Sequence, residues 1–225
     1  MRFRQDGSRQ FQVRPNRNGL SARIRWLACT ALTGLAVLAA SGSAQAGVLV
    51  SSATSCDDQV FEQPFLRFAD PANYVLAPSG TFEQNTDAWT LTGGASVVSG
   101  NETFFVHAPA EASSLSLPPN SSATSAPMCV GIEHPTLRLL ARNRGGLLST
   151  LQVEVLFEDA AGNTQSLPIG VLLGGSAWKP TIPMPVVVNL LPLLPGEHTS
   201  VAFRFSTGSG SWQIDDVYVD PYRSR

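Results

Sequence analysis

Two adjacent carboxylates, Asp215 and Asp216, stand in the middle of the segment "WQIDDVYVDP" at residues 212–221. Such a pair can be solvated on a sheet surface, hold a cation, or act as a catalytic acid and base. Neighbouring residues of a regular strand point to opposite faces unless a bulge intervenes. A glycosidase needs its two acids facing each other roughly 5 to 10 Å apart, which opposed side chains do not provide. The segment therefore argues against a catalytic pair and leaves two solvated acids and a cation site as open interpretations.

Recognisable catalytic motifs are missing from the rest of the sequence. The histidines, His107, His134 and His198, are isolated, and none belongs to an H-E-x-x-H motif. No G-x-S-x-G nucleophile motif occurs. A distant acid such as Glu83 or Glu154 would complete a pair, but no pattern selects one. The sequence predicts a noncatalytic protein and leaves a hydrolase with an unrecognised site as an alternative.

The elements that position these residues are predicted to be strands. Residues 136–143, 151–159 and 200–206 read "TLRLLARN", "LQVEVLFED" and "SVAFRFS", in which apolar and polar residues alternate. Clusters of Gly, Pro and Asn separate them, and no window of eleven or more residues beyond residue 46 keeps a helical apolar period without Pro or Gly. The pattern predicts an all-β fold, a two-sheet antiparallel sandwich. Its shared core is expected to include Leu137, Val153 and Phe203.

The same alternation places a row of polar side chains outward. Arg138, Glu154 and Arg204 belong to this row. These side chains could form hydrogen bonds with a polyol or a carboxylate. Rows of this kind are also commonly cross-strand ion-pair ladders, so both interpretations stay open.

Residues 1–46 are predicted to be a secretory signal peptide. Residues 1–25 hold seven arginines and one acid, residues 26–40 are apolar, and Ala44 and Ala46 supply small residues for cleavage. The apolar run is shorter than the ~20 residues of a bilayer span. We expect a secreted protein without a stable membrane anchor after cleavage, with an uncleaved anchor as the alternative.

The mature chain that this cleavage leaves has 179 residues, enough for one domain. It keeps 8 basic and 16 acidic residues, a net charge of about −8, which argues against a nucleic-acid partner. Its two cysteines, Cys56 and Cys129, are predicted to form a disulfide in an oxidising compartment. Residues 47–71 show no sustained period and are predicted to be a lead-in segment to the domain at residues 72–221.

Both ends of this domain resemble jelly-roll, galactose-binding-like carbohydrate-binding modules. The segment "NYVLAPSGTFEQNTDAWTLTGGASVVSGN" at residues 73–101 has an apolar strand, a small-residue turn and a tryptophan strand, and "WQIDDVYV" is similar to their last strand. The whole chain also looks like a group of uncharacterised secreted bacterial proteins. The resemblance implies a jelly-roll sandwich in which the first strand, near Ala77, lies beside the strand of Ile214.

The resemblance also implies a structural calcium where the first and last strands meet. It makes Glu83 and Asp215 side-chain ligands, adds carbonyl oxygens near Thr81 and Asn101, and lets Asp216 assist. Calcium takes six to eight oxygen ligands, and carboxylates and carbonyls together suit it.

Sugar binding in that family uses exposed aromatic side chains on a sheet or on loops. The candidates here are Trp89, Trp178 and Trp212, of which Trp178 is expected in a loop and the other two also fit a core position. The predicted function is therefore a secreted, noncatalytic module that binds a polysaccharide, another glycan or a cell-envelope polymer. A structural or adhesive module that contacts a protein is the alternative.

Overall fold

The computed structural model describes residues 49, 55–83, 86–131, 135–159, 161–186 and 198–221. The chain divides into two units, Met1–Ser41 and Gly42–Arg225, and every described residue belongs to the second. The predicted signal peptide lies outside the described residues. Within them, no helix has the length and the apolar character that crossing a membrane requires.

The described part of the second unit consists of thirteen strands and a 3-10 turn, η1. In chain order these are η1 (Leu66–Phe68), β1 (Val75–Leu76), β2 (Trp89–Thr92), β3 (Ser96–Ser99), β4 (Ser113–Leu117), β5 (Ser122–Ser125), β6 (Met128–Gly131), β7 (Thr136–Asn143), β8 (Leu151–Glu158), β9 (Thr164–Leu172), β10 (Lys179–Pro180), β11 (Met184–Pro185), β12 (His198–Thr207) and β13 (Trp212–Asp220).

One sheet, the β13 sheet, is built around the last strand. Its order is β10-β7-β13-β4-β3, with β1 also paired to β13 and β11 also paired to β7. All of its pairings are antiparallel. Strand β1 places Val75 opposite Val219, and the amide of Ala77 donates to the carbonyl of Val217 at 2.9 Å. The predicted neighbourhood of the first and last strands is confirmed.

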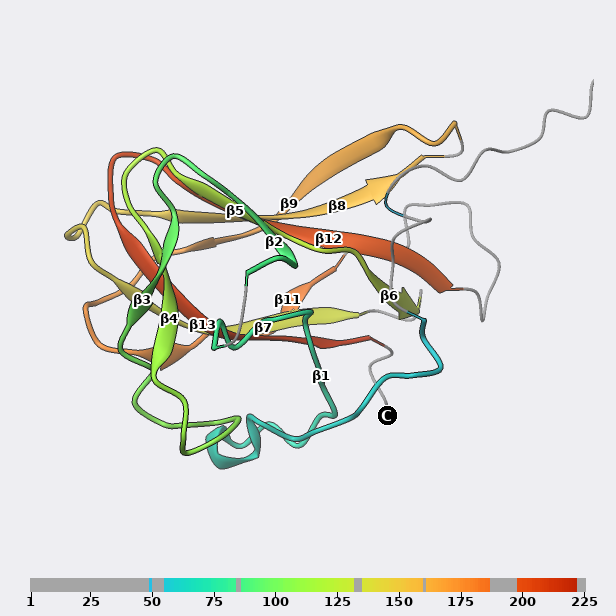
Figure 1. The fold of residues 1–225 in the computed structure, drawn as a ribbon, viewed down its shortest axis with the longest axis horizontal. Helices are drawn as coiled ribbons and strands as arrows, with labels where there is room; N and C mark the ends of the chain where they lie inside the picture. Colours follow the sequence, from blue (N-terminus) through green and yellow to red (C-terminus); the bar gives the residue numbers. More distant parts are fainter. Residues whose placement is uncertain are drawn as a thin grey trace, which may run out of the picture. The chain divides into compact units, whose positions relative to one another are not determined.

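The other sheet, the β12 sheet, has the order β2-β5-β12-β8-β9, with β6 also paired to β12. The two sheets enclose one apolar core to which Leu137, Val153 and Phe203 all contribute, as predicted. Figure 1 shows the two layers, with β5, β8 and β12 in one and β7 and β13 in the other. The all-β, two-sheet antiparallel jelly-roll fold predicted from the sequence is confirmed.

The outer face of the β13 sheet is covered by the lead-in segment. A second cluster of buried residues forms there from Phe65, Tyr74, Leu140, Trp178 and Tyr218. The lead-in, blue-green in Figure 1, passes beneath β7 and β13. Because β13 is covered on both faces, all nine of its residues are buried. Alternation within β13 therefore does not separate a core face from a solvent face.

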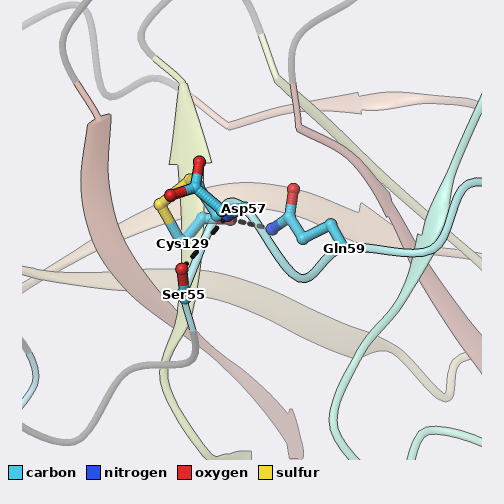
Figure 2. Close-up of a disulfide and its surroundings, with 5 residues drawn as sticks. Ser55, Asp57, Gln59 and Cys129 are labelled. Carbon is cyan, nitrogen blue, oxygen red and sulfur yellow. Dashed lines mark hydrogen bonds between the residues drawn. A yellow bond between two sulfur atoms is a disulfide. The ribbon is translucent and has the colours of Figure 1, made fainter.

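The predicted disulfide joins the lead-in to the sandwich. Cys56 is bonded to Cys129 on β6, with their Cα atoms 5.2 Å apart. Figure 2 shows this bond with Gln59 beside it, whose side-chain amide donates to the carbonyl of Cys129 at 2.7 Å. The bridge closes a loop of 73 residues, which in the chain-entropy model stabilises the fold by roughly 4 kcal/mol.

Candidate functional site

A β-bulge in the last strand carries the two adjacent carboxylates. Asp215 lies opposite Leu140 on β7, whereas Tyr218 lies opposite Arg138, so β13 contains one residue more than its partner over this stretch. Asp216 has a φ of 48°, a left-handed conformation that Asp adopts more readily than most residues. Asp215 and Asp216 are both 0% exposed. The bulge therefore buries two carboxylates in succession on one strand.

The two carboxylates differ in how their oxygens are satisfied. Asp215 accepts hydrogen bonds from the backbone amides of Glu102 and Asp216, each at 3.0 Å. Neither side-chain oxygen of Asp216 has a hydrogen-bond partner, although both are buried. Because a buried carboxylate without partners is costly, Asp216 is the group at this site that most needs a ligand.

Two further acids come from the loop between β3 and β4. Glu102, 0% exposed, accepts from the backbone amides of Phe104 and Val106, the second at 2.7 Å. Glu111 accepts from the amide of Ala108 at 3.2 Å and lies 2.6 Å from Nδ1 of His107. Sequence reasoning missed both acids, because they lie outside the alternating strands. The signal that could have identified Glu102 is its position next to the predicted ligand Asn101 in "NETFF".

Burial and mutual repulsion shift the pKa values of the pair upward. Burial, followed by the charge of Asp216, raises the pKa of Asp215 to about 9. Burial, followed by the charges of Glu111, Glu102 and Glu83, raises the pKa of Asp216 to about 8. No described Arg or Lys makes an ion pair with either Asp. Among the described residues, Asp215 and Asp216 therefore have no cationic side chain in an ion pair with them.

Three of the predicted calcium ligands surround the bulge. Glu83 accepts from the amides of Ala112 and Ser113 at 2.8 and 2.6 Å, and its charge contributes to the raised pKa of Asp216. The side-chain oxygen of Asn101 is buried and has no partner. Thr81 is next to Gly80 in the chain. The carbonyl of Gly80 accepts a hydrogen bond at 3.1 Å from the amide of Val217, the residue that follows Asp216.

These residues fit a cation only if several kinds of oxygen contribute. The described residues include no group of three or more His, Cys, Asp or Glu side chains arranged to hold a metal ion. The unpartnered oxygens of Asp216 and Asn101 are nevertheless hard oxygen ligands of the type that calcium takes. A calcium here would combine them with backbone carbonyls and water rather than with a cage of carboxylates.

The tryptophans predicted to contact sugar are buried. Trp89 belongs to the core, and its indole Nε1 donates to the carbonyls of Pro78 and Ser79 at 2.9 and 3.2 Å. Trp178 is 4% exposed, with the guanidinium of Arg142 4.8 Å from its ring centroid. Trp178 lies in the loop between β9 and β10, as expected, but its ring is buried in the cluster on the outer face of the β13 sheet and is covered by Arg142. Neither ring offers a stacking surface.

The predicted row of three polar residues is divided between the two sheets. Arg138 lies on β7 in the β13 sheet, where its guanidinium donates to the carbonyl of Thr181 at 2.7 Å and pairs with Asp70. It also lies 4.5 Å from the ring centroid of Phe65 and is only 7% exposed. The prediction of a single outward row that includes Arg138 was therefore wrong. The cause is the lead-in, which supplies both Asp70 and Phe65.

Glu154 and Arg204 remain together on the outer side of the β12 sheet. They lie directly opposite each other on β8 and β12, and their side chains form an ion pair at 2.8 Å. The hydrogen bond from Arg204 is the main reason that the pKa of Glu154 is lowered. The ion-pair interpretation of this part of the row is correct.

Hydroxyl and amide side chains extend this pair into a polar surface, which we call the polar face. Paired residues on adjacent strands share a face, and the residues between them along each strand point into the core. The polar face consists of Thr90, Thr92, Ser122, Thr124, Gln152, Glu154, Arg204 and Ser206. The hydroxyls of Thr92 and Ser122 are 2.8 Å apart. This surface presents hydrogen-bonding side chains across four strands.

No protein-family model matches the sequence, and no curated protein matches it. Among solved structures, the chain is similar to the CBM22-1 and GH10 modules of endo-1,4-β-D-xylanase 10B from Clostridium thermocellum, with 15% identity, a TM-score of 0.45, and coverage of 62% of this chain and 27% of that chain. It is similar to the enzymatically active domain of tailspike protein 4 of bacteriophage CBA120, with 21% identity, a TM-score of 0.45, and coverage of 63% and 20%.

A third similar structure is a xylan-binding domain of carbohydrate-binding module family 22, with 18% identity, a TM-score of 0.44, and coverage of 69% of this chain and 99% of that chain. Carbohydrate-binding modules, the class that the sequence resembles, thus recur among the similar structures. The chain spans about a quarter of the xylanase modules and a fifth of the tailspike domain. At these identities and TM-scores, the similarities assign no ligand or activity to this chain.

Proposed function

We propose that this chain is a secreted, noncatalytic β-sandwich module that binds a carbohydrate or a cell-envelope polymer through the polar face and carries a structural calcium at the β13 bulge. The polar face is the observation that carries the binding proposal. Saccharides present many hydroxyls that both donate and accept, and a sheet surface of Thr, Ser, Gln, Glu and Arg side chains offers the complementary groups.

The polar face suits recognition by hydrogen bonding rather than by stacking. Its residues include no aromatic side chain, and the tryptophans considered for this role are buried. The ion pair between Arg204 and Glu154 holds two charged groups in a fixed arrangement beside the hydroxyls. Since each such hydrogen bond replaces one to water, its net gain is only about 0.5–1.5 kcal/mol, and we expect weak binding that multiple contacts along a polymer strengthen.

The noncatalytic part of the proposal is supported by the burial of the acid pair. Asp215 and Asp216 are both 0% exposed, and the core and the covered outer face of the β13 sheet surround them. A polymer therefore has no access to either carboxylate. Secretion is supported by the disulfide between Cys56 and Cys129, because such bonds persist in oxidising compartments.

The calcium part of the proposal rests on the unpartnered oxygens of Asp216 and Asn101. A divalent cation would satisfy both and would balance the nearby charges of Glu83, Glu102 and Glu111. Such an ion would join β13 to the loop that follows β3, because Asp216 lies on the first and Asn101 on the second. Its role would be to hold the last strand in place rather than to contact the polymer.

The binding proposal is tested with the mature chain and a panel of polysaccharides that includes xylan, galactan and peptidoglycan. The double variant Thr124→Val with Arg204→Met removes donors from the centre of the polar face, and Ser96→Ala on β3 removes an exposed hydroxyl elsewhere. We expect affinity electrophoresis to show retardation of the wild type and of Ser96→Ala by at least one polymer, and little retardation of the double variant. Absence of retardation by every polymer, or equal retardation of all three proteins, would contradict the proposal.

A protein-binding module is a second candidate because of the turn between β7 and β8. Leu147 and Leu148 are 96% and 94% exposed there. Two adjacent leucines on a protruding turn are typical of a contact with another protein. Loss of binding to a defined protein partner in Leu147→Ser, with unchanged retardation by polysaccharides, would favour this candidate.

A further inference from the structure

A cleft opens at the edge of the sandwich where the two sheets end together. Strand β9 is the last in the path of the β12 sheet and β10 is the last in that of the β13 sheet, and residues 173–178 connect them. The cleft between them has a volume of about 340 Å³. It lies at the lower end of the range of about 300–1,000 Å³ that is typical of small-molecule sites.

The walls of the cleft are mostly apolar. Leu172 and Trp212 line it from the core side, and Trp212 is only 2% exposed. Leu173 and Ile182 line it nearer the surface and are 73% and 77% exposed. Large exposed aliphatic side chains beside a cleft lose contact with water when a ligand enters. This burial contributes about 25 cal/mol of binding free energy per Å² of apolar area. The cleft therefore favours an apolar group of limited size.

The charged residue of the cleft is Lys179, which is the only lysine in the sequence. Lys179 lies opposite Ala141 on β7, and paired residues share a face. Because Ala141 packs into the core, the side chain of Lys179 leaves β10 on the side of the gap between the sheets. It makes no ion pair with any described residue, and no Asp or Glu lines the cleft. Among the described residues, a lysine without an ion-pair partner thus stands beside a mostly apolar cleft.

We propose that this cleft binds a free anionic amphiphile, a molecule with one short alkyl chain or aromatic ring and a carboxylate or similar head group. The apolar part would lie against Trp212, Leu172 and Ile182, and the head group would pair with the ammonium group of Lys179. The size of the cleft limits the apolar part to a short chain or one ring system. This site is separate from the polar face, which lies on the outer side of the β12 sheet.

An inward lysine on an edge strand also has a purely protective explanation. Such residues discourage the edge from pairing with another chain. Protection requires the charge but no ligand, whereas the proposed site requires both the charge and the cleft. Variants that change these two features separately distinguish the explanations.

The probe is decanoate below its micelle concentration, with decanol as the uncharged match, and binding to the mature chain is followed by calorimetry and tryptophan fluorescence. Gly174→Leu is designed to fill the cleft, because a Cβ atom at this position meets only the Trp212 ring edge, at 3.8 Å. We expect this variant to lose decanoate binding. Lys179→Met should bind decanoate roughly tenfold more weakly than the wild type does, and its affinity for decanol should be unchanged. Ser96→Ala, on β3 and outside the cleft, should bind as the wild type does, and thermal melts check that each variant is folded.

The proposal is overturned if decanoate does not bind saturably, if Gly174→Leu binds it as the wild type does, or if Lys179→Met leaves its affinity unchanged. The last result would leave edge protection as the role of Lys179. Vesicles of anionic lipid serve as a separate arm. Vesicle binding that depends on Leu147, without binding of free decanoate, would make this end of the sandwich a membrane contact and would also overturn the proposal.

Discussion

The sandwich contains buried carboxylates in two contrasting environments, one in the ion pair on the β12 sheet and the other in the acid pair of the β13 bulge. Glu154 lies opposite Arg204 and bonds to it at 2.8 Å, and its pKa is lowered. Asp216 has no partner for either oxygen, and its pKa is raised to about 8. Both acids are nearly or fully buried, so burial alone does not explain the difference. The difference lies in the counter-charge, because the described residues place Arg204 in an ion pair with Glu154 and place no cationic side chain in an ion pair with Asp216.

This contrast predicts that the two regions differ in their response to a cation in solution. Removing a cation from solution should leave the pair of Glu154 and Arg204 unaffected, because its positive charge is covalently part of the protein. The bulge should respond strongly, since the carboxylate of Asp216 is either protonated or neutralised by a bound ion.

Calcium should raise the melting temperature of the wild type, and Asp216→Ala should abolish the rise. An ion that binds only the folded state at a thousandfold excess over Kd contributes about 4 kcal/mol. For a chain of this size, that corresponds to a shift of roughly 10 °C. The measurement is a thermal melt with calcium and with a chelator. Glu154→Gln is the matched control and should keep the full calcium response. If the wild-type melting curves with calcium and with chelator coincide, the proposed calcium site is contradicted.

The pH dependence of stability should have opposite signs in the two regions when a chelator is present. Asp215 and Asp216 have raised pKa values of about 9 and 8, so the folded state holds protons that the unfolded state has released. Their contribution therefore falls as pH rises from about 4 to 9. The lowered pKa of Glu154 gives a contribution that is present above its unfolded pKa and is lost in acid.

Urea unfolding in chelator across this pH range measures both effects. We expect the free energy of unfolding to decrease from pH 5 to pH 9, and calcium to reduce this decrease because it favours the ionised acids. In Asp216→Asn, the decrease in chelator should be smaller. A free energy of unfolding that rises steadily with pH in chelator would show that the bulge acids are ionised without a metal.

Asn101→Ala should weaken the calcium response without removing it. Asn101 contributes one neutral oxygen, whereas Asp216 contributes a charge and two oxygens, so the neutral ligand matters less. Calorimetric titration with calcium should show a higher Kd than for the wild type and a remaining saturable signal. An unchanged Kd would place the ion away from the loop after β3.

The fold itself could largely be predicted from the sequence. Alternation in β7, β8 and β12 identified the core positions Leu137, Val153 and Phe203, and two cysteines in a chain expected to be exported identified the disulfide. These features depend on local periodicity and on a choice between few partners. The strand of Ile214 was placed correctly beside the first strand because the two ends of the domain resemble a known arrangement.

What covers the outer face of a sheet could not be predicted in the same way. Alternation marks Arg138 as outward, but the lead-in then buries it through Asp70 and Phe65, which no periodic pattern links to β7. The family resemblance implies Asp215 as the side-chain ligand and Asp216 as an assisting group, whereas the unpartnered oxygens belong to Asp216. The reason is the bulge, because one extra residue changes where each carboxylate points, and a bulge has no reliable sequence signal.

The smallest effect is expected for the ion pair on the polar face. Arg204 is 34% exposed in its side chain, so solvent screens its attraction to Glu154. A double-mutant cycle with Glu154→Gln and Arg204→Met should give a coupling free energy of up to about 1 kcal/mol, and salt should reduce it. The same cycle should show no dependence on calcium, because both charges are satisfied within the chain. A coupling that changed with calcium would connect the polar face to the bulge and would end the distinction between the two regions.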